Sequence, residues 1–280
     1  MKRLHSVLLA IVLLAVVTSG ARGGQPGPPT EVRAVPQTRA VRIPLKPLSL
    51  PDVAQSSNAD AGTLLFTPGA EDELPEGPDG FDVLEDGNIL ITDPLRDSIS
   101  MFDAQGKFKG AWKIGFAADS ITALASGLIL VREANTGQLH AFDREGKPRP
   151  AEGAVLPQPA EARILGEQSG TVARQGGGTI EVQFDQPGLR LLSLESLGTD
   201  AQGNTYVAME TTAGGSGSED VNLNKYIRKY SADGKLVSEV VKIPLDYYIV
   251  PVDELRVRKG VVYQLTSDKL EVRINVWDMN

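Results

Sequence analysis

The chain has 280 residues, of which 41% are hydrophobic, and it contains 29 glycines, 18 prolines and no cysteine. The lack of cysteine excludes disulfides and thiolate metal sites. The formal net charge of −8 argues against nucleic acid or an anionic membrane as the main partner. His5 and His140 are the only histidines, which excludes a multi-histidine zinc site.

Residues 1–21 predict a secretory signal peptide. Lys2 and Arg3 precede an uninterrupted apolar run of 11 residues, Val7 to Val17, and small residues place the cleavage after Ala21. The run is short for a bilayer span, although an uncleaved anchor is the alternative. We therefore expect a secreted or periplasmic protein with no stable membrane span after cleavage. The absence of disulfides fits a bacterial periplasm or exterior.

Residues 22–61 predict a proline-rich linker, because prolines favour an extended chain. Residues 22–51 hold five basic residues against Glu31 and carry a net charge of +4. Because Lys2 and Arg3 add +2 in residues 1–21, residues 52–280 carry −14, which gives the total of −8. The segment is either a flexible tether or a basic arm that lies on an acidic face. Val41, Ile43 and Leu45 alternate with other residues, so part of the arm could dock as a strand.

The rest of the chain is organised around a turn that recurs. An aromatic residue closes a strand, Asp follows it in four of the five units, and Gly often ends the turn. The aromatic residues are separated by 40, 42, 46 and 47 residues, at Phe102, Phe142, Phe184, Tyr230 and Trp277. Asp accepts hydrogen bonds from the backbone ahead of it, and Gly adopts positive φ at little cost. Units of about 40–50 residues are typical of four-stranded propeller blades.

Short alternating runs between these turns predict strands and hence an all-β fold. The predicted strands, in chain order, are 81–84, 89–92, 98–102 and 107–114; 121–124, 128–131, 138–142 and a weak fourth near Pro148; 162–165, 171–174, 179–184 and 190–194; 197–200, 205–209, 225–230 and 236–243; 254–257, 261–266 and 270–277.

The last of these groups has only three strands. Residues 63–67 resemble the segments that open the fourth strands, and Gly62 lies 44 residues before Gly106. We therefore expect residues 63–67 to supply the outer strand of the last blade and so to close a propeller domain over residues 62–280. The prediction is five four-stranded blades, with six as the alternative.

The segment Asp93-Pro94-Leu95-Arg96-Asp97-Ser98-Ile99-Ser100-Met101-Phe102 resembles the NHL and YWTD classes of propeller repeat, which carry an Asp nine residues before the aromatic residue. The equivalent positions are Asp93, Glu133, Gln175 and Asp268, and in the fourth unit the strand-ending acid is Glu210, which the insertion displaces. The resemblance implies a β-propeller over residues 62–280. It implies no particular function, because propellers host binding modules and several types of enzyme.

These five residues have two interpretations. They could form a carboxylate ring for a cation or basic ligand, or each could accept backbone hydrogen bonds in its own turn. The same face is expected to carry Arg96, Asp97, Asn135, Arg174, Tyr247 and Tyr248 and the Gly/Ser-rich insertion 211–224. The predicted ligand-binding residues are Asp93, Arg96, Glu133, Arg174, Glu210, Tyr247 and Tyr248.

Two classes of function remain open. The first is a binding or interaction protein that presents this loop face to a protein or small ligand. The second is a propeller hydrolase or lactonase that acts on sugar-type substrates with carboxylates or bound Ca²⁺, for which Asp82 and Glu254 are the best candidates. We predict a monomer with no cofactor and no resident metal. His140 is expected to be structural.

Overall fold

The computed structural model describes residues 32–48, 62–70, 72–174, 177–213 and 222–280, and Val32–Asn280 forms one compact unit. The predicted signal peptide and its cleavage site lie outside the described residues. The regular elements of the described chain are strands and one 3-10 turn, η2 (Pro94–Arg96). No helix in these ranges has the length and apolar character needed to cross a bilayer.

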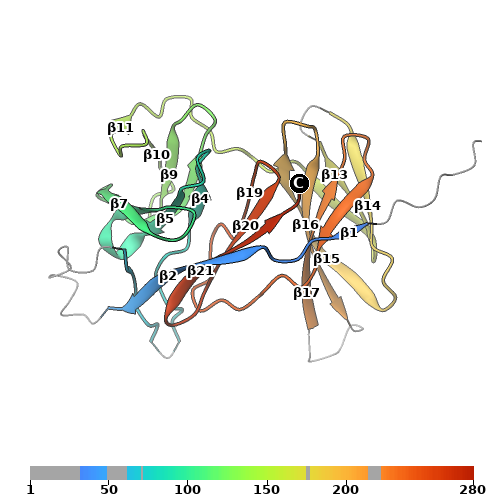
Figure 1. Ribbon diagram of the computed structural model, residues 1–280, viewed down its shortest axis with the longest axis horizontal. Helices are drawn as coiled ribbons and strands as arrows, with labels where there is room; N and C mark the ends of the chain where they lie inside the picture. Colours follow the sequence, from blue (N-terminus) through green and yellow to red (C-terminus); the bar gives the residue numbers. More distant parts are fainter. Residues whose placement is uncertain (1–31, 49–61, 71, 175–176, 214–221) are drawn as a thin grey trace, which may run out of the picture. The chain divides into compact units, whose positions relative to one another are not determined.

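The strands form five sheets, and the first two follow the sequence prediction closely (Figure 1). Sheet 1 contains β4 (Phe81–Val83), β5 (Ile89–Asp93), β6 (Ser98–Phe102) and β7 (Phe108–Lys113). Sheet 2 contains β8 (Ala118–Ala123), β9 (Ile129–Glu133), β10 (Leu139–Phe142) and β11 (Pro148–Arg149). Consecutive strands are antiparallel in both sheets.

The recurring turn works as predicted where it joins β6 to β7. Asp103 Oδ1 accepts hydrogen bonds from the backbone N–H groups of Gln105 and Lys107, both at 2.9 Å. Gly106 has φ +84°, which a larger residue adopts only at a cost. Asp143 repeats this pattern between β10 and β11. The hydrogen bonds from Lys107 and Gln105 lower the pKa of Asp103.

Sheet 3 has three strands, and its predicted fourth strand is wrong. It contains β12 (Ala162–Gly166), β13 (Ser169–Ala173) and β14 (Thr179–Gln183). Residues 190–194 instead belong to β15 (Leu189–Thr199), which starts sheet 4 with β16 (Thr205–Ala213), β17 (Asn222–Tyr230) and β18 (Leu236–Val240). The β16–β17 hairpin is longer than predicted, so Thr211–Ala213 pair with Leu189–Leu191 and draw that segment into sheet 4.

Sheet 5 corrects the predicted position of the N-terminal strand. It contains β19 (Leu255–Arg258), β20 (Val261–Ser267) and β21 (Glu271–Asp278). The strand next to β21 is β2 (Arg39–Pro47), which pairs antiparallel with it, whereas β3 (Leu64–Phe66) pairs parallel with β2. Residues 64–66 are therefore the outermost strand of sheet 5, as expected, but β2 lies between them and β21, because the alternating residues of β2 occupy that edge.

Part of the predicted linker is thus folded. Val41, Ile43 and Leu45 of β2 are buried, and β1 (Arg33–Ala34) pairs parallel with β18 in sheet 4. The predicted domain boundary at residue 62 differs from the start of the compact unit at Val32. Residues 22–31 and 49–61 of the predicted linker lie outside the described residues.

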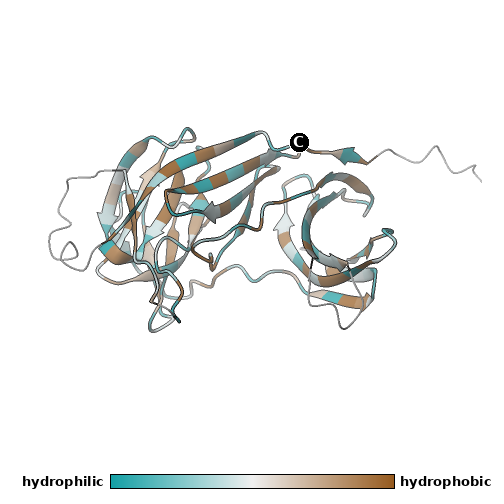
Figure 2. Ribbon diagram, turned by 90° about the horizontal axis from the view of Figure 1, so that it is seen from below, coloured by the Kyte–Doolittle hydropathy of each residue, from teal (hydrophilic) through white to brown (hydrophobic). Residues whose placement is uncertain are grey.

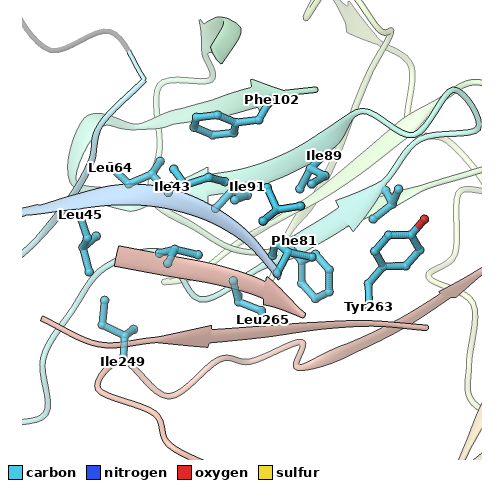
Figure 3. Packing of buried hydrophobic residues seen from close by; sticks show 14 of the residues in the cluster. Ile43, Leu45, Leu64, Phe81, Ile89, Ile91, Phe102, Ile249, Tyr263 and Leu265 are labelled. Carbon is cyan, nitrogen blue, oxygen red and sulfur yellow. The ribbon is translucent and has the colours of Figure 1, made fainter. Parts of the chain in front are cut away.

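Four hydrophobic clusters join the sheets in pairs. Strands alternate between hydrophobic and hydrophilic residues (Figure 2), so each sheet presents an apolar face to its neighbour. The largest cluster joins sheet 5 and sheet 1 and includes Ile43, Leu64, Phe81, Phe102 and Leu265 (Figure 3). The other three join sheets 4 and 5, sheets 3 and 4, and sheets 1 and 2.

This series of small antiparallel sheets, each packed on another, is consistent with a β-propeller. Sheets 2 and 3 are the exception, since none of the four clusters of described residues joins them. The outward residues of β14, Thr179, Glu181 and Gln183, are polar and exposed. Five closed blades therefore stay a prediction.

Candidate functional site

The predicted strand-end residues are held within their own sheets. Asp93, at the end of β5, is buried, and its Oδ2 accepts a hydrogen bond of 2.7 Å from Arg96. Arg96 also donates to the backbone oxygen of Thr63 at 2.6 Å, which ties η2 to the segment before β3. Burial raises the pKa of Asp93, and Arg96 opposes this effect. Both side chains are thus engaged in structural contacts.

Glu133 and Asp268 repeat this local pattern. Glu133 Oε2 lies 3.2 Å from His140 Nε2, and the imidazole ring stacks on Phe116 at 4.2 Å. Asp268 accepts hydrogen bonds from the backbone of Leu270 and forms an ion pair with Arg273. Among the described residues, these side chains form no group that could hold a metal ion. Gln175 lies outside the described residues.

The other predicted ligand-binding residues are also engaged. Arg174 donates to the backbone oxygen of Ala232 at 2.5 Å. Tyr248 packs edge-on against Phe66 with a centroid distance of 5.3 Å, and Lys269 lies over its ring at 5.4 Å. These contacts explain why the two residues are held in place. Residues 214–221 of the predicted insertion lie outside the described residues.

Glu210 and Tyr247 belong to one polar group, which we call the lysine cluster: Glu210, Lys225, Tyr247, Glu254 and Gln264. Lys225 Nζ lies 2.9 Å from Glu210 Oε1 and also contacts Glu254 Oε2. Tyr247 donates its hydroxyl hydrogen to Glu254, and Gln264 Nε2 donates to the tyrosine oxygen at 3.0 Å. Burial opposes the charge of Lys225, but its bonds to both glutamates raise its pKa overall.

The carboxylates Asp82 and Glu254, predicted as the best catalytic candidates, have structural roles. Asp82 is fully buried, and it accepts hydrogen bonds of 2.7 Å from the backbone of Val83 and of Ala123. Arg258 forms an ion pair with the carboxylate of Asp82. Because a catalytic acid or base needs access to a substrate proton, Asp82 is not a suitable candidate. The carboxylate of Glu254 is already bonded to Lys225 and Tyr247 in the lysine cluster.

A second polar group lies where sheets 1, 2 and 5 meet. We call it the carboxylate–arginine cluster: Asp79, Asp119, Arg132, Asp253 and Arg256. Arg132 forms hydrogen bonds of 2.9 and 3.2 Å with Asp119, and Arg256 lies 2.7 Å from Asp253. Ser120 of β8 donates to Asp253 at 2.5 Å, which links sheets 2 and 5. The backbone N–H of Val252 donates to the backbone oxygen of Asp79 at 2.8 Å, which links sheets 5 and 1.

Within this cluster, Asp79 has a strongly raised pKa. Its Oδ1 accepts a hydrogen bond of 3.2 Å from Thr92. Burial raises the pKa of Asp79 from 3.8 to about 7, and the charges of Asp119 and Asp253 add to this effect, while Thr92 opposes it. Asp79 is therefore partly protonated at neutral pH, beside two carboxylates that are paired with arginines. One carboxyl group that can give a proton next to ionised ones is typical of acid–base sites.

Glu195 of β15 connects the two clusters. Its side chain is exposed, and it makes no hydrogen bond or ion pair with any described residue. Although its surface is accessible to solvent, the protein around it partly desolvates the carboxyl group and raises its pKa; Lys225 and Arg256 oppose this effect, and Glu254 and Asp253 reinforce it. Glu195 therefore interacts electrostatically with charged groups of both clusters. It is the acid of this region that is left available to a ligand.

The sequence contained a signal for this group that was missed. Asp79, Asp119 and Glu195 each lie two residues before the predicted start of a first strand and eight residues before a hairpin glycine: Gly87, Gly127 and Gly203. Asp253 lies two residues before Leu255 and seven before Gly260. Equivalent positions of repeated units lie near one another at one end of their strands. This repeated position before the first strand is therefore a better predictor of acids that lie near one another than the position at the end of the second strand.

Among the described residues, no group of three or more His, Cys, Asp or Glu side chains is arranged to hold a metal ion. A shallow pocket lies elsewhere, beside the hairpin turns of sheets 1 and 2, and Val83, Ala123, Leu128, Arg144 and Arg258 contribute to its lining. Arg258, which lines this pocket, is already paired with the buried Asp82. The carboxylate–arginine cluster with Glu195 is therefore the strongest candidate site in the described part of the chain.

No protein-family model matches the sequence, and no curated protein matches it. Virginiamycin B lyase from Staphylococcus aureus is similar in structure, with a TM-score of 0.37 and 9% identity, over 72% of this chain and 94% of that one. A DUF4221 family member from Bacteroides vulgatus has a TM-score of 0.32 and 9% identity, over 87% and 97%. Regucalcin, a calcium-binding protein from Agrobacterium tumefaciens, has a TM-score of 0.30 and 9% identity, over 72% and 91%. These values assign no function, and the fold rests on the strand pairing described above.

Proposed function

We propose that the protein is an exported β-propeller binding protein whose ligand carries a cationic group. The observation that carries the proposal is that Asp79, Asp119 and Asp253 lie in one cluster, and that Glu195 of β15 interacts electrostatically with Asp253 and Arg256 of that cluster. Two arginines, Arg132 and Arg256, compensate only part of this charge. Lysine or arginine side chains and amines are the ligand groups that complement such a site.

The state of each acid supports binding rather than a scaffold role alone. Asp119 and Asp253 are fixed by their arginine partners, which holds the walls of the site in place. Glu195 is exposed and unpaired, so it can form an ion pair with a ligand without breaking an internal contact. Rigid surroundings reduce the ordering cost of binding. The proposed location, a periplasm or the cell exterior, is supported by the signal-like residues 1–21.

Binding of an arginine-containing tripeptide amide, measured by calorimetry at two salt concentrations, tests the proposal. Glu195→Gln should weaken binding about three- to tenfold, because a charge-assisted contact is lost. Glu145→Gln removes the same charge from the exposed turn after β10 and should leave binding unchanged. Equal effects of the two variants would show that only the general acidity of the body attracts the peptide, and the proposal would fail.

A hydrolase or lactonase is the second candidate, and the raised pKa of Asp79 favours it. In that case Asp79 donates the proton to the leaving group while Asp119 or Asp253 activates water. Turnover of lactone and glycoside panels should be lost in Asp79→Asn and follow a pH profile with an inflection near the pKa of Asp79. Turnover that persists in Asp79→Asn would remove this candidate.

A further inference from the structure

Most sheets protect the edge formed by their last strand. In sheet 4, β1 covers β18, and in sheet 5, β2 and β3 cover β21. In sheet 1, β7 exposes Lys109 and Lys113 and has a register shift. In sheet 2, β11 has two residues and begins with Pro148. Covering strands, lysines, bulges and prolines all prevent an edge from pairing with another chain.

Sheet 3 lacks these devices. Its last strand, β14 (Thr179–Gln183), has the sequence Thr-Ile-Glu-Val-Gln and no partner beyond it among the described strands. Threonine, isoleucine and valine favour extended structure, and the strand contains no proline, lysine or glycine. The segment expected to cover it, residues 190–194, is paired in sheet 4. Within the described part of the chain, this edge is therefore uncovered, whereas the last strands of the other four sheets are protected.

The register shows which backbone groups are free. The N–H of Phe184 donates to the oxygen of Gln168, and the N–H of Arg174 donates to the oxygen of Gly178. Antiparallel pairs alternate between bonded and non-bonded, and the pairing of β13 with β14 is uninterrupted between these points. Ile180 and Val182 therefore bond to β13, whereas Thr179, Glu181 and Gln183 direct their backbone groups outward.

One of these outward groups is already used. Arg228 of β17 donates to the backbone oxygen of Gln183 at 2.5 Å, which leaves the groups of Thr179 and Glu181 and the N–H of Gln183. Ile180 and Val182 point to the cluster shared with sheet 4, and the side chain of Glu181 is exposed at the centre of the strand. An added strand would find backbone partners along this edge and a negative charge at its middle.

We propose that β14 is a docking strand for an extended segment of a partner protein, which adds antiparallel to it with a lysine or arginine opposite Glu181. Strand addition of this kind takes affinity from backbone hydrogen bonds and specificity from alternate side chains. A second copy of this chain fits less well, because an antiparallel pair that uses all the outward residues places Glu181 opposite Glu181. Like charges directly opposite each other are destabilising.

The test uses the peptide Gly-Ser-Thr-Val-Lys-Val-Thr-Ser-Gly and its counterpart with Glu in place of Lys. The lysine lies opposite Glu181, and the valines extend the apolar face of Ile180 and Val182. Affinity is measured by NMR titration, and the backbone N–H groups of Thr179 and Glu181 are followed by hydrogen exchange. Wild-type protein should bind the Lys peptide about two- to fivefold tighter than the Glu peptide. Both N–H groups should become protected.

Two variants separate the charge from the backbone. Glu181→Lys should reverse the preference between the peptides. Glu181→Pro removes an outward N–H but no bond to β13, and it should weaken binding of the Lys peptide about tenfold. An unchanged unfolding midpoint shows that this variant keeps its fold.

Three results would overturn the proposal. One is Lys-peptide affinity that does not change in Glu181→Pro. Another is the absence of binding or protection with either peptide. The third is a concentration-dependent dimer in sedimentation equilibrium that Glu181→Pro abolishes, because the occupant would then be a second copy.

Discussion

Replacing Asp79 by Asn should stabilise the folded protein at pH 8 but not at pH 4. The pKa of Asp79 is raised from 3.8 to about 7, so the folded state holds its proton more tightly than the unfolded state does. Stability from this group is present in acid and is lost as the pH rises from about 4 through 7. Asn is neutral at every pH, so the variant should lack this loss. Thr92 can still donate to the amide oxygen.

The expected change in the free energy of unfolding follows from the pKa shift of Asp79. A rise from 3.8 to about 7 corresponds to an upper limit of ~4 kcal/mol, at about 1.4 kcal/mol for each pKa unit. Asp79 is only partly buried, and solvent screening reduces the effect. We therefore expect a stabilisation of about 1–2 kcal/mol at pH 8, which falls toward zero near pH 4.

Urea unfolding of wild type and Asp79→Asn at pH 4, 6 and 8 measures this difference. Asp103→Asn is a matched control of opposite sign, because backbone hydrogen bonds lower the pKa of Asp103. It should reduce stability at pH 8 and lose its effect in acid, as the wild-type carboxylate becomes protonated. A difference for Asp79→Asn that is independent of pH, or that is destabilising at pH 8, would refute the reasoning.

Three further predictions concern the fold. Ile43→Ala should lower the free energy of unfolding in urea by about 2–5 kcal/mol, because Ile43 is fully buried in β2; a smaller loss would show that β2 is not part of the core. Arg258→Met should cost up to about 3–5 kcal/mol in the same assay, since the buried Asp82 then keeps only Arg256, at 3.9 Å, as a cationic partner, and Asp82→Asn in the same chain should restore part of that loss. Gly146→Ala should lower the melting temperature more than Gly137→Ala: both glycines have positive φ, but a Cβ at Gly146 meets an indole ring and one at Gly137 meets open space. Equal shifts would contradict this contact.

The sequence predicts most strands because period-two alternation and turn chemistry agree in sheets 1, 2 and 5. The prediction of a fourth strand in sheet 3 was wrong because of a pairing between segments that the local sequence pattern does not show. Residues 190–194 alternate like an outer strand, but the extended β16–β17 hairpin offers them a longer ladder than β14 does. The local sequence pattern of residues 190–194 does not indicate whether they pair with β14 or with β16.

The prolines of β2 misled the prediction in a different way. Proline cannot donate to a ladder, so Pro44 and Pro47 favour a linker. In the structure β2 pairs with β21 up to Pro44 and with β3 from Leu45 to Pro47. Each proline therefore lies at the end of a ladder, where its missing N–H costs little.

The candidate site was only partly predictable. Four of the predicted strand-end residues lie in the described chain, but Arg96, His140, Lys225 and Arg273 contact them as local partners. The acids that converge precede the first strand of each unit, and their common spacing to a glycine was readable. Which of them stays unpaired depends on arginines from other strands, and single-sequence patterns do not show these contacts.

The pairing of β2 with β21 has a consequence for biosynthesis. Ile43 and Ile274 are 231 residues apart in the sequence, yet they belong to neighbouring strands. A nascent chain must therefore carry Val41, Ile43 and Leu45 without their partner until β21 has left the ribosome. During that interval Pro44 and Pro47 interrupt a sticky apolar segment, as gatekeeper residues do. The same prolines that end the ladders also reduce premature aggregation while the polypeptide waits for its last strand.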